Sequence, residues 1–308
     1  MKKKKPDEGT TSKLLSTTAV VFLMMLMVGL NGMKVEAATL KSETVEAWED
    51  YVQLTEERIA HELESDEGYF VVDFLPSEEV EGCREKLAAG EICVLKMAAP
   101  GDSGEEPEIP SGLVHHWLGS LFVSNVSLDE LMTWVQSYND HERYFEEVEA
   151  SKLLSKEGDV YDILLRLKRK KIVTVHYNTE HRVEYRHHDA LRVSSKSHTT
   201  RISQIENPGT SSERERPEGR DSGFLWRLNS YWRYKEVNGG VLVELETLSL
   251  SRGIPAAVKW LVAGYINSVP RESLQSTLSS IRDGVTETTT ARKAAAVHRS
   301  PAVGNRSN

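Results

Sequence analysis

The sequence is poor in cysteine and lacks the patterns of several common catalytic sites. Its 308 residues include only two cysteines, Cys83 and Cys93, which excludes a disulfide-dense scaffold and a four-cysteine zinc site. The two can form one disulfide or remain separate thiols, and both alternatives are open at this stage. There is no GxSxG, HExxH, GxGxxG or P-loop motif. We therefore predict no catalytic residues, no metal site and no cofactor.

Long apolar runs are also scarce, and the one present lies near the start of the chain. Lysines at positions 2–5 precede an uncharged stretch at 14–30, and Val35-Glu36-Ala37 follows, with small residues where a signal peptidase reads. This order is typical of a secretory signal. We predict a signal peptide over 1–37 and an exported protein, either periplasmic or secreted. Because the run is at the short limit of a membrane span, an uncleaved membrane anchor is the alternative.

Positive charge is in deficit over most of the chain. The net charge is -9, and the segments 1–37 and 286–308 carry +3 each, which leaves -15 on 38–285. Such an acidic segment repels a phosphate backbone, so we predict no nucleic-acid partner. The short basic run Lys168–Lys171 is a weak indication of contact with anionic lipid at a membrane surface. No pattern in the sequence indicates an oligomeric state.

What remains is an ordinary globular composition, 39% hydrophobic and 28% charged. Periodicity predicts an amphipathic helix over 42–65, whose stripe is Val45, Trp48, Val52, Thr55, Ile59 and Leu63. A strand at Tyr69–Leu75, a small acidic helix and a strand at Glu91–Met97 are expected next. The Pro/Gly/acid-rich connector 99–112 is expected to separate this N-terminal part, 38–98, from a main domain, 113–285.

The main domain has the pattern of an antiparallel sheet followed by helices. Ser127 and Glu130 form a capping-box signature that opens a helix, and a shorter helix is expected near 140–146. Pro270 is expected to open the second of two C-terminal helices, and the tail 286–308 to be disordered. The expected strands are 113–124, 146–155, 159–169, 171–178, 181–187 and 191–206, and the expected C-terminal helices are 254–267 and 270–283.

A long hairpin is predicted over 224–250, with its turn at Asn238-Gly239. A two-residue turn there places Arg233 opposite Glu244 and Tyr231 opposite Glu246, and side chains alternate between the two faces. One face is mainly apolar and the other carries the charges. Three placements of the charged face are open: in water behind an apolar core face, inward as a polar floor for a ligand head group, or on a hairpin that projects off the sheet.

Four segments of this domain resemble one family in wording as well as in order. They are GLVHHWLGSLFV at 112–123, GFLWRLNSYWRYKE at 223–236, GGVLVELETLSLSRGIP at 239–255 and SVPRESLQSTL at 268–278. These segments resemble a group of exported bacterial proteins of the START-like superfamily, also called the SRPBCC, polyketide cyclase or Bet v 1-like superfamily. The resemblance spans about 112–285. It implies an α+β helix-grip fold: a curved antiparallel sheet wrapped around a long C-terminal helix, here with an added N-terminal helix.

The resemblance also implies a cavity between the sheet and the C-terminal helix. We expect the protein to bind or carry a lipid or other hydrophobic small molecule there. An enzyme of the cyclase or hydratase type, or an interaction module whose cavity is filled by its own side chains, are the competing functions. The expected ligand wall is Trp226, Leu228, Ser230, Trp232, Tyr234, Val243, Leu245, Leu261, Tyr265, Leu274 and Leu278. The alternative polar set is Arg227, Tyr231, Arg233, Glu244 and Glu246.

Overall fold

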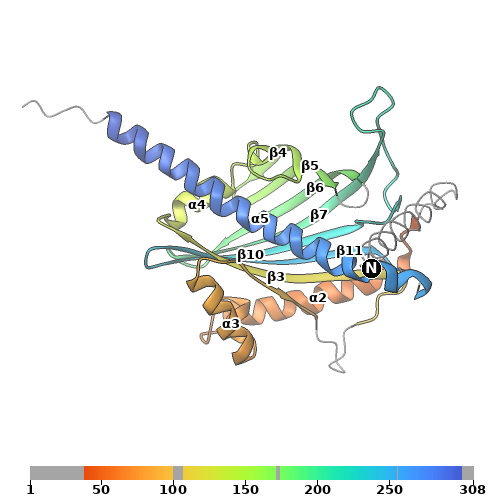
Figure 1. Ribbon diagram of the computed structural model, residues 1–308, viewed down its shortest axis with the longest axis horizontal. Coiled ribbons are helices and arrows are strands. Elements are labelled where there is room, and N and C mark those ends of the chain that lie inside the picture. Colours follow the sequence, from red (N-terminus) through yellow and green to blue (C-terminus); the bar gives the residue numbers. More distant parts are fainter. Residues whose placement is uncertain (1–37, 100–106, 171–173, 255, 300–308) are drawn as a thin grey trace, which may run out of the picture. The chain divides into compact units, whose positions relative to one another are not determined.

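The computed structural model describes residues 38–99, 107–170, 174–254 and 256–299, with the side chains of 256–267 and 295–299 outside the description. From Thr39 onward the chain forms one compact unit, in which helices flank an antiparallel sheet (Figure 1). The connector at 99–112 therefore does not divide this part into two units. Strand β2, which precedes the connector, pairs with β3, which follows it.

The main sheet has nine strands in the order β2-β3-β11-β10-β7-β6-β5-β4, with β8 beside β7. Strands β2 and β4 are its two edges, so the sheet is open. The pairings between neighbours are antiparallel. The strands are β2 (Cys93–Lys96), β3 (Gly112–Ser124), β4 (Val148–Glu157), β5 (Val160–Lys170), β6 (Thr174–His187), β7 (Arg192–Glu206), β8 (Arg214–Glu215), β10 (Arg227–Val237) and β11 (Gly240–Arg252); β1 (Ala38–Thr39) and β9 (Arg220–Asp221) lie outside this sheet.

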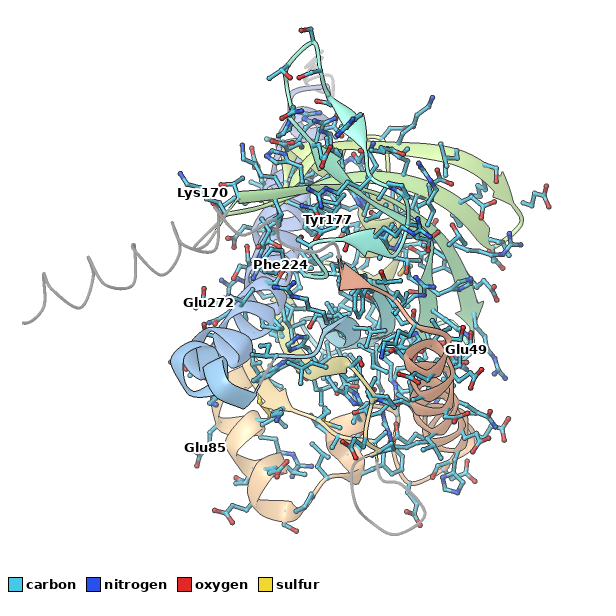
Figure 2. All side chains as sticks on the ribbon, turned by 90° about the vertical axis from the view of Figure 1, so that its right-hand side faces the viewer. Glu49, Glu85, Lys170, Tyr177, Phe224 and Glu272 are labelled. Atoms are coloured by element: carbon cyan, nitrogen blue, oxygen red, sulfur yellow. A yellow bond between two sulfur atoms is a disulfide. The ribbon has the colours of Figure 1, made fainter. Side chains whose placement is uncertain are left out.

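Helices lie on both sides of the sheet. Figure 2 shows the long C-terminal helix α5 (Ala256–Arg299) on one side and α2 (Ser42–Glu64) on the other. We call the side toward α5 the inner face and the side toward α2 the outer face. The remaining helices are α3 (Ser77–Ala88), α4 (Leu128–Val135) and the short 3-10 turns η1 (Val71–Phe74) and η2 (His141–Arg143).

Several local predictions are confirmed. The predicted helix 42–65 is α2, and Ser127 and Glu130 form the expected capping box, with the Glu130 N–H donating to Ser127 Oγ at 3.2 Å. The hairpin also has the predicted register, with Arg233 opposite Glu244 and Val237 opposite Gly240. Capping and two-residue turns are set by neighbouring residues, which is why the sequence predicts them correctly.

The strand predicted at Tyr69–Leu75 is wrong, because this segment forms the 3-10 turn η1. The Asp73 carboxylate accepts the backbone N–H groups of Tyr69 and Phe70, at 2.9 and 3.0 Å, and closes the turn. The strands predicted at 171–178 and 181–187 are one strand, β6, in the described part from Thr174 on. An irregularity at Glu180 and His181 lies where the break was expected.

The C-terminal helices are also not separate. Helix α5 continues through Pro270, because proline removes only one N–H bond and a packed helix tolerates it. The helix continues to Arg299, so the tail is helical rather than disordered over 286–299. Thr289 is buried and Lys293 Nζ donates to the Asn125 carbonyl at 3.2 Å. These contacts supply the burial that the polar tail sequence did not indicate.

The cysteine question is resolved in favour of pairing. Cys83 in α3 and Cys93 in β2 form a disulfide, with their Cα atoms 5.2 Å apart. Both residues are 2% exposed. The bond joins α3 to the edge strand of the main sheet and removes both thiols from reaction with solvent.

Candidate ligand-binding face of the sheet

The position of α5 over the sheet depends on a glycine in β3. A Cβ atom at Gly119 would lie 2.5 Å from Leu278 Cδ1 and 3.1 Å from Leu274 Cγ. Helix α5 therefore approaches the sheet more closely than any residue with a side chain would allow. This contact identifies the inner face. Because side chains alternate along each strand, it also assigns every second residue of the neighbouring strands to that face.

One half of the inner face is fully buried against α5. Tyr234, Val243 and Leu245 are at most 2% exposed and lie in one hydrophobic cluster with Leu278 and Ile281 of α5. We call this region the packed half. Burial of such side chains stabilises the fold by about 1.5–3 kcal/mol each. At this end the space between sheet and helix is occupied by the protein's own side chains.

The other half of the inner face keeps accessible surface. On β10 the inner residues that precede Tyr234, and on β11 those that follow Leu245, are partly exposed. They are Trp232, Ser230 and Leu228 on β10, and Thr247 and Ser249 on β11. The neighbouring strands change in the same way. We call this region the accessible half; it comprises His115, Ser197, Thr199, Leu228, Ser230, Trp232, Thr247, Ser249 and Ser251, all intermediate in exposure.

The accessible half includes one histidine, His115, and a second, His181, lies beside it on β6. His115 Nε2 lies 3.0 Å from Ser251 Oγ, and His181 Nε2 lies 2.9 Å from Thr179 Oγ1. Burial lowers the pKa of each ring to about 4, with a further contribution from Lys96 at His115 and from His198 at His181. Both imidazoles are therefore neutral near neutral pH, and each can donate or accept a hydrogen bond.

Side-chain contacts fix the structure at two edges of the accessible half. Trp226 is 3% exposed, and its Nε1 donates to Asp221 Oδ1 at 3.2 Å. At the β5 side, Arg169 pairs with Glu147 and donates to the Val269 carbonyl of α5. The loop before β10 and the middle of α5 are thereby fixed at the rim of the accessible half.

The outer face differs in kind, because its centre is charged and buried. Arg233, Glu244 and Glu246 are at most 2% exposed. Arg233 Nη2 lies 2.5 Å from Glu62 Oε2, and Arg58 pairs with both Glu62, at 2.7 Å, and Glu246. We call Arg58, Glu62, Arg233, Glu244 and Glu246 the outer cluster. It joins α2 to β10 and β11.

Backbone groups and a histidine complete this cluster. The N–H groups of Val71 and Val72 donate to the two oxygens of Glu244, at 2.7 and 3.3 Å. Nevertheless, burial raises the pKa of Glu244 to about 7. Glu246 is different, because His116 Nε2 at 2.5 Å and Arg58 hold the pKa of its carboxyl below the ordinary value despite burial.

The charged face of the hairpin thus takes none of the three placements that the sequence left open. It is not in water, it is not on the α5 side and the hairpin does not project from the sheet. Helix α2 and η1 cover it instead: Tyr231 OH donates to Glu56 at 2.8 Å, and Arg233 donates to the Tyr69 carbonyl at 2.8 Å. Arg227, the remaining member of the polar set, is partly exposed and bonded to Glu218.

The expected ligand wall is divided by the same geometry. Leu228, Ser230 and Trp232 lie in the accessible half, whereas Tyr234, Val243, Leu245, Leu274 and Leu278 belong to the packed half. The Trp232 and Tyr234 rings stack across the boundary, with centroids 5.9 Å apart and planes 4° apart. The side chains of Leu261 and Tyr265 lie outside the described part of the structure.

Sequence reasoning missed the polar residues that accompany this wall. Ser197 and Thr199 of β7 lie directly beside Ser230 and Leu228, and Thr247 and Ser249 lie on their other side. The signal was present in β11, where serine and threonine take every second position after Leu245. It identifies a face only once the register with β10 and β3 is known.

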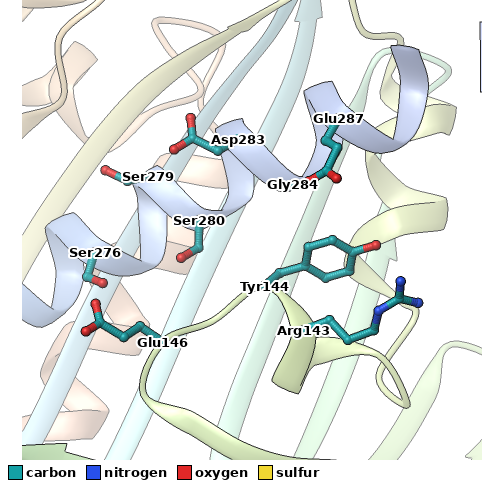
Figure 3. A pocket seen from close by; sticks show the side chains of 9 residues that line it. All are labelled: Arg143, Tyr144, Glu146, Ser276, Ser279, Ser280, Asp283, Gly284 and Glu287. Carbon is teal, nitrogen blue, oxygen red and sulfur yellow. The ribbon is translucent and has the colours of Figure 1, made fainter. Parts of the chain in front are cut away.

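A separate pocket of about 330 Å3 opens beside α5, away from this face (Figure 3). Serines and carboxylates of α5 line one side, and Arg143, Tyr144 and Glu146 line the other. Arg143, Glu146 and Asp283 are exposed, so water screens their charges. None of the residues predicted from the sequence to bind a ligand lines this pocket.

The described residues offer neither a metal centre nor a membrane-spanning helix. They contain no group of three or more His, Cys, Asp or Glu side chains placed to hold a metal ion. The helices within the described ranges include none that is both long and apolar enough to cross a bilayer.

Comparison with known proteins shows similarity at the level of structure. No protein-family model and no curated protein matches the sequence. Among solved structures, a STAR-related lipid transfer protein from Xanthomonas axonopodis is 15% identical, with a TM-score of 0.41 over 63% of this chain and 98% of that chain. Human STARD10 is 7% identical, with a TM-score of 0.42 over 78% and 90%. Zhui aromatase/cyclase from Streptomyces sp. R1128 is 8% identical, with a TM-score of 0.37 over 57% and 96%.

The architecture of this chain matches what its sequence motifs imply. An open antiparallel sheet packs one face on a long C-terminal helix, and an added N-terminal helix covers the opposite face. The prediction of a helix-grip fold is confirmed. The chain has the α+β architecture that the sequence predicted, with a long C-terminal helix packed on an open antiparallel sheet.

Proposed function

We propose that this protein binds a hydrophobic or amphipathic small molecule between the accessible half of the inner face and α5. The observation that supports the proposal is the change in burial along single strands. On β11, Val243 and Leu245 are at most 2% exposed, whereas Thr247 and Ser249 on the same face keep accessible surface. A core-facing surface that is incompletely buried is suited to receive a ligand.

The accessible half combines the two kinds of contact that such a ligand needs. Leu228 and the indole of Trp232 offer apolar surface, and burial of ligand against them contributes about 25 cal/mol for each Å2 removed from water. Ser230 and Thr247, directly opposite each other, offer hydrogen bonds that orient the ligand. The protein acts in this proposal as a binding or carrier protein and supplies no catalytic group.

We also propose that the protein works outside the cytoplasm. The segment 1–37 has the order of a secretory signal. The Cys83–Cys93 disulfide supports this location, because stable disulfides belong to oxidising compartments and are rare in the cytosol.

Native mass spectrometry of the full chain, purified from an exporting host and followed by organic extraction, tests the binding proposal. We expect a co-purifying apolar molecule, or uptake of one from a lipid mixture. The variant Leu228→Glu places a carboxylate in the accessible half and is expected to abolish retention. Leu154→Glu is the matched control, because Leu154 is 45% exposed on β4. A wild-type protein that neither carries nor takes up an apolar molecule would contradict the proposal and favour an interaction module.

A further inference from the structure

Charge is sorted between the two faces at the accessible half. Along β10 and its neighbours, inner positions hold hydroxyl, aliphatic or aromatic side chains, and the charged residues Lys196, Arg227 and Glu246 lie at the outer positions between them. On β7, Ser197 is inner and Lys196 is outer; on β11, Thr247 is inner and Glu246 is outer. The same strands that bury an ionic cluster on one side thus present no formal charge on the other.

The hydroxyl groups of this half form a continuous row. Ser197 on β7, Ser230 on β10 and Thr247 on β11 lie directly opposite one another across adjacent strands. Neighbouring strands are about 4.8 Å apart, so the row extends about 10 Å across the sheet. Each hydroxyl is both a donor and an acceptor, and the neutral rings of His115 and His181 lie beside the row on β3 and β6.

Resting on the proposed function, we propose that the ligand is a neutral amphiphile: an apolar body with hydroxyl, ester or carbonyl groups that hydrogen-bond to this row. Fatty-acid anions and phosphate-bearing lipids are excluded from the same position. The geometry favours this class because a carboxylate or phosphate placed here would lose water without gaining a cationic partner from the described strands, a loss that hydroxyl groups alone do not offset.

Among the described residues, two cations on the inner side of the sheet, Arg169 and Lys96, do not change that conclusion. Arg169 is already paired with Glu147 and bonded to the Val269 carbonyl, and Ser273 Oγ also donates to Glu147, at 2.6 Å. Lys96 lies on the edge strand β2 and is exposed, so water screens it. Recruiting Arg169 to an anionic ligand would break the link between β5 and α5.

A pair of matched probes tests this inference: a long-chain fatty acid that carries an anthracene fluorophore, and its methyl ester. Energy transfer from tryptophan to the fluorophore reports binding to the full chain near neutral pH. We expect the ester to bind at least about tenfold more tightly than the acid. Acid binding as tight as ester binding overturns the inference alone, whereas binding of neither probe removes the proposed function as well.

Two variants sharpen the result. Thr247→Lys introduces an ammonium group into the row and is expected to raise affinity for the acid about tenfold, so that the preference for the ester is lost. Leu154→Lys, on the exposed side of β4, is the matched control and is expected to change neither affinity. If the wild type binds the acid and Arg169→Gln abolishes that binding, Arg169 is an anion site and the inference is overturned. Should Thr247→Lys fail to fold, the wild-type probe pair still decides.

Discussion

The two faces of the same strands differ in charge and in burial. On the outer face, Arg233 and Glu244 are buried because α2 and η1 supply Glu62 and backbone N–H groups to match them. On the inner face, Ser230 and Thr247 keep accessible surface although they face a helix. A buried charged group needs its own partner residue, and no other molecule can replace that partner. An uncharged group with accessible surface can instead contact a ligand that binds and leaves. This comparison supports the proposal that the inner face receives a ligand, while the outer face stabilises the fold.

The largest expected effect comes from removing a partner in the outer cluster. Arg233→Met leaves Glu244 buried without its cation and Glu62 with Arg58 alone, and we expect a loss of about 3–5 kcal/mol in the free energy of unfolding. Urea denaturation measures it. Lys235→Met is the matched control, on the same face of β10 but only partly buried, and is expected to cost less than about 1 kcal/mol. Equal losses in the two variants would contradict a special role for the cluster.

A smaller effect is expected where α5 touches the inner face. Gly119→Ala adds a Cβ that would lie 2.5 Å from Leu278 Cδ1, so the buried Leu278 side chain or α5 must shift, at a cost of about 1–3 kcal/mol. Gly82→Ala is the control, because nothing lies within 4 Å of a Cβ there; within helix α3 it is expected to stabilise by about 0.5–1 kcal/mol. Thermal unfolding of both variants gives the comparison. If Gly119→Ala loses no stability, the contact between Gly119 and Leu278 can adjust without cost.

Alternation and turn chemistry predicted an antiparallel sheet and the hairpin register. One long C-terminal helix was implied only by the family resemblance of four segments, because periodicity indicated two helices separated at Pro270. The sequence did not predict what covers the charged face. The expected apolar stripe of α2 ended at Leu63, but the helix buries Glu62 instead, and the Glu62 carboxylate accepts a hydrogen bond from Arg233. A buried glutamate is recognisable only with its partner, and that partner lies 171 residues away. The sequence likewise identified Ser230 but not Ser197, because cross-strand neighbours depend on pairing between distant strands.

The pH dependence of stability distinguishes the faces by sign. His181 on the inner side has its pKa lowered by burial from 6.5 to about 4, so the unfolded chain takes up a proton below about 6.5 while the folded chain does not. Its contribution is complete above that pH and is lost as the pH falls toward 4. Glu244 has its pKa raised to about 7, so its contribution is complete below its ordinary pKa and is lost as the pH rises through 7.

His181→Leu isolates the inner contribution. Between pH about 6.5 and about 5 we expect the wild type to lose about 1–2 kcal/mol more stability than this variant, measured by urea denaturation at each pH. His187→Leu is the control, since His187 is exposed at the end of the same strand, and its pH profile is expected to follow the wild type. Parallel profiles for wild type and His181→Leu would mean that His181 titrates as it does in water.

The smallest effect is expected where charge is paired but exposed. Arg214 Nε lies 2.6 Å from Glu206, yet the Arg214 side chain is 74% exposed. This pair is as close as that of Arg233 and Glu62, so distance alone would assign both the same strength. Water screens the exposed pair and its side chains lose mobility in forming it. We expect Arg214→Ala to change the free energy of unfolding by at most about 1 kcal/mol, and less at high salt. A loss comparable to that of Arg233→Met would show that burial is not what separates strong ion pairs from weak ones in this protein.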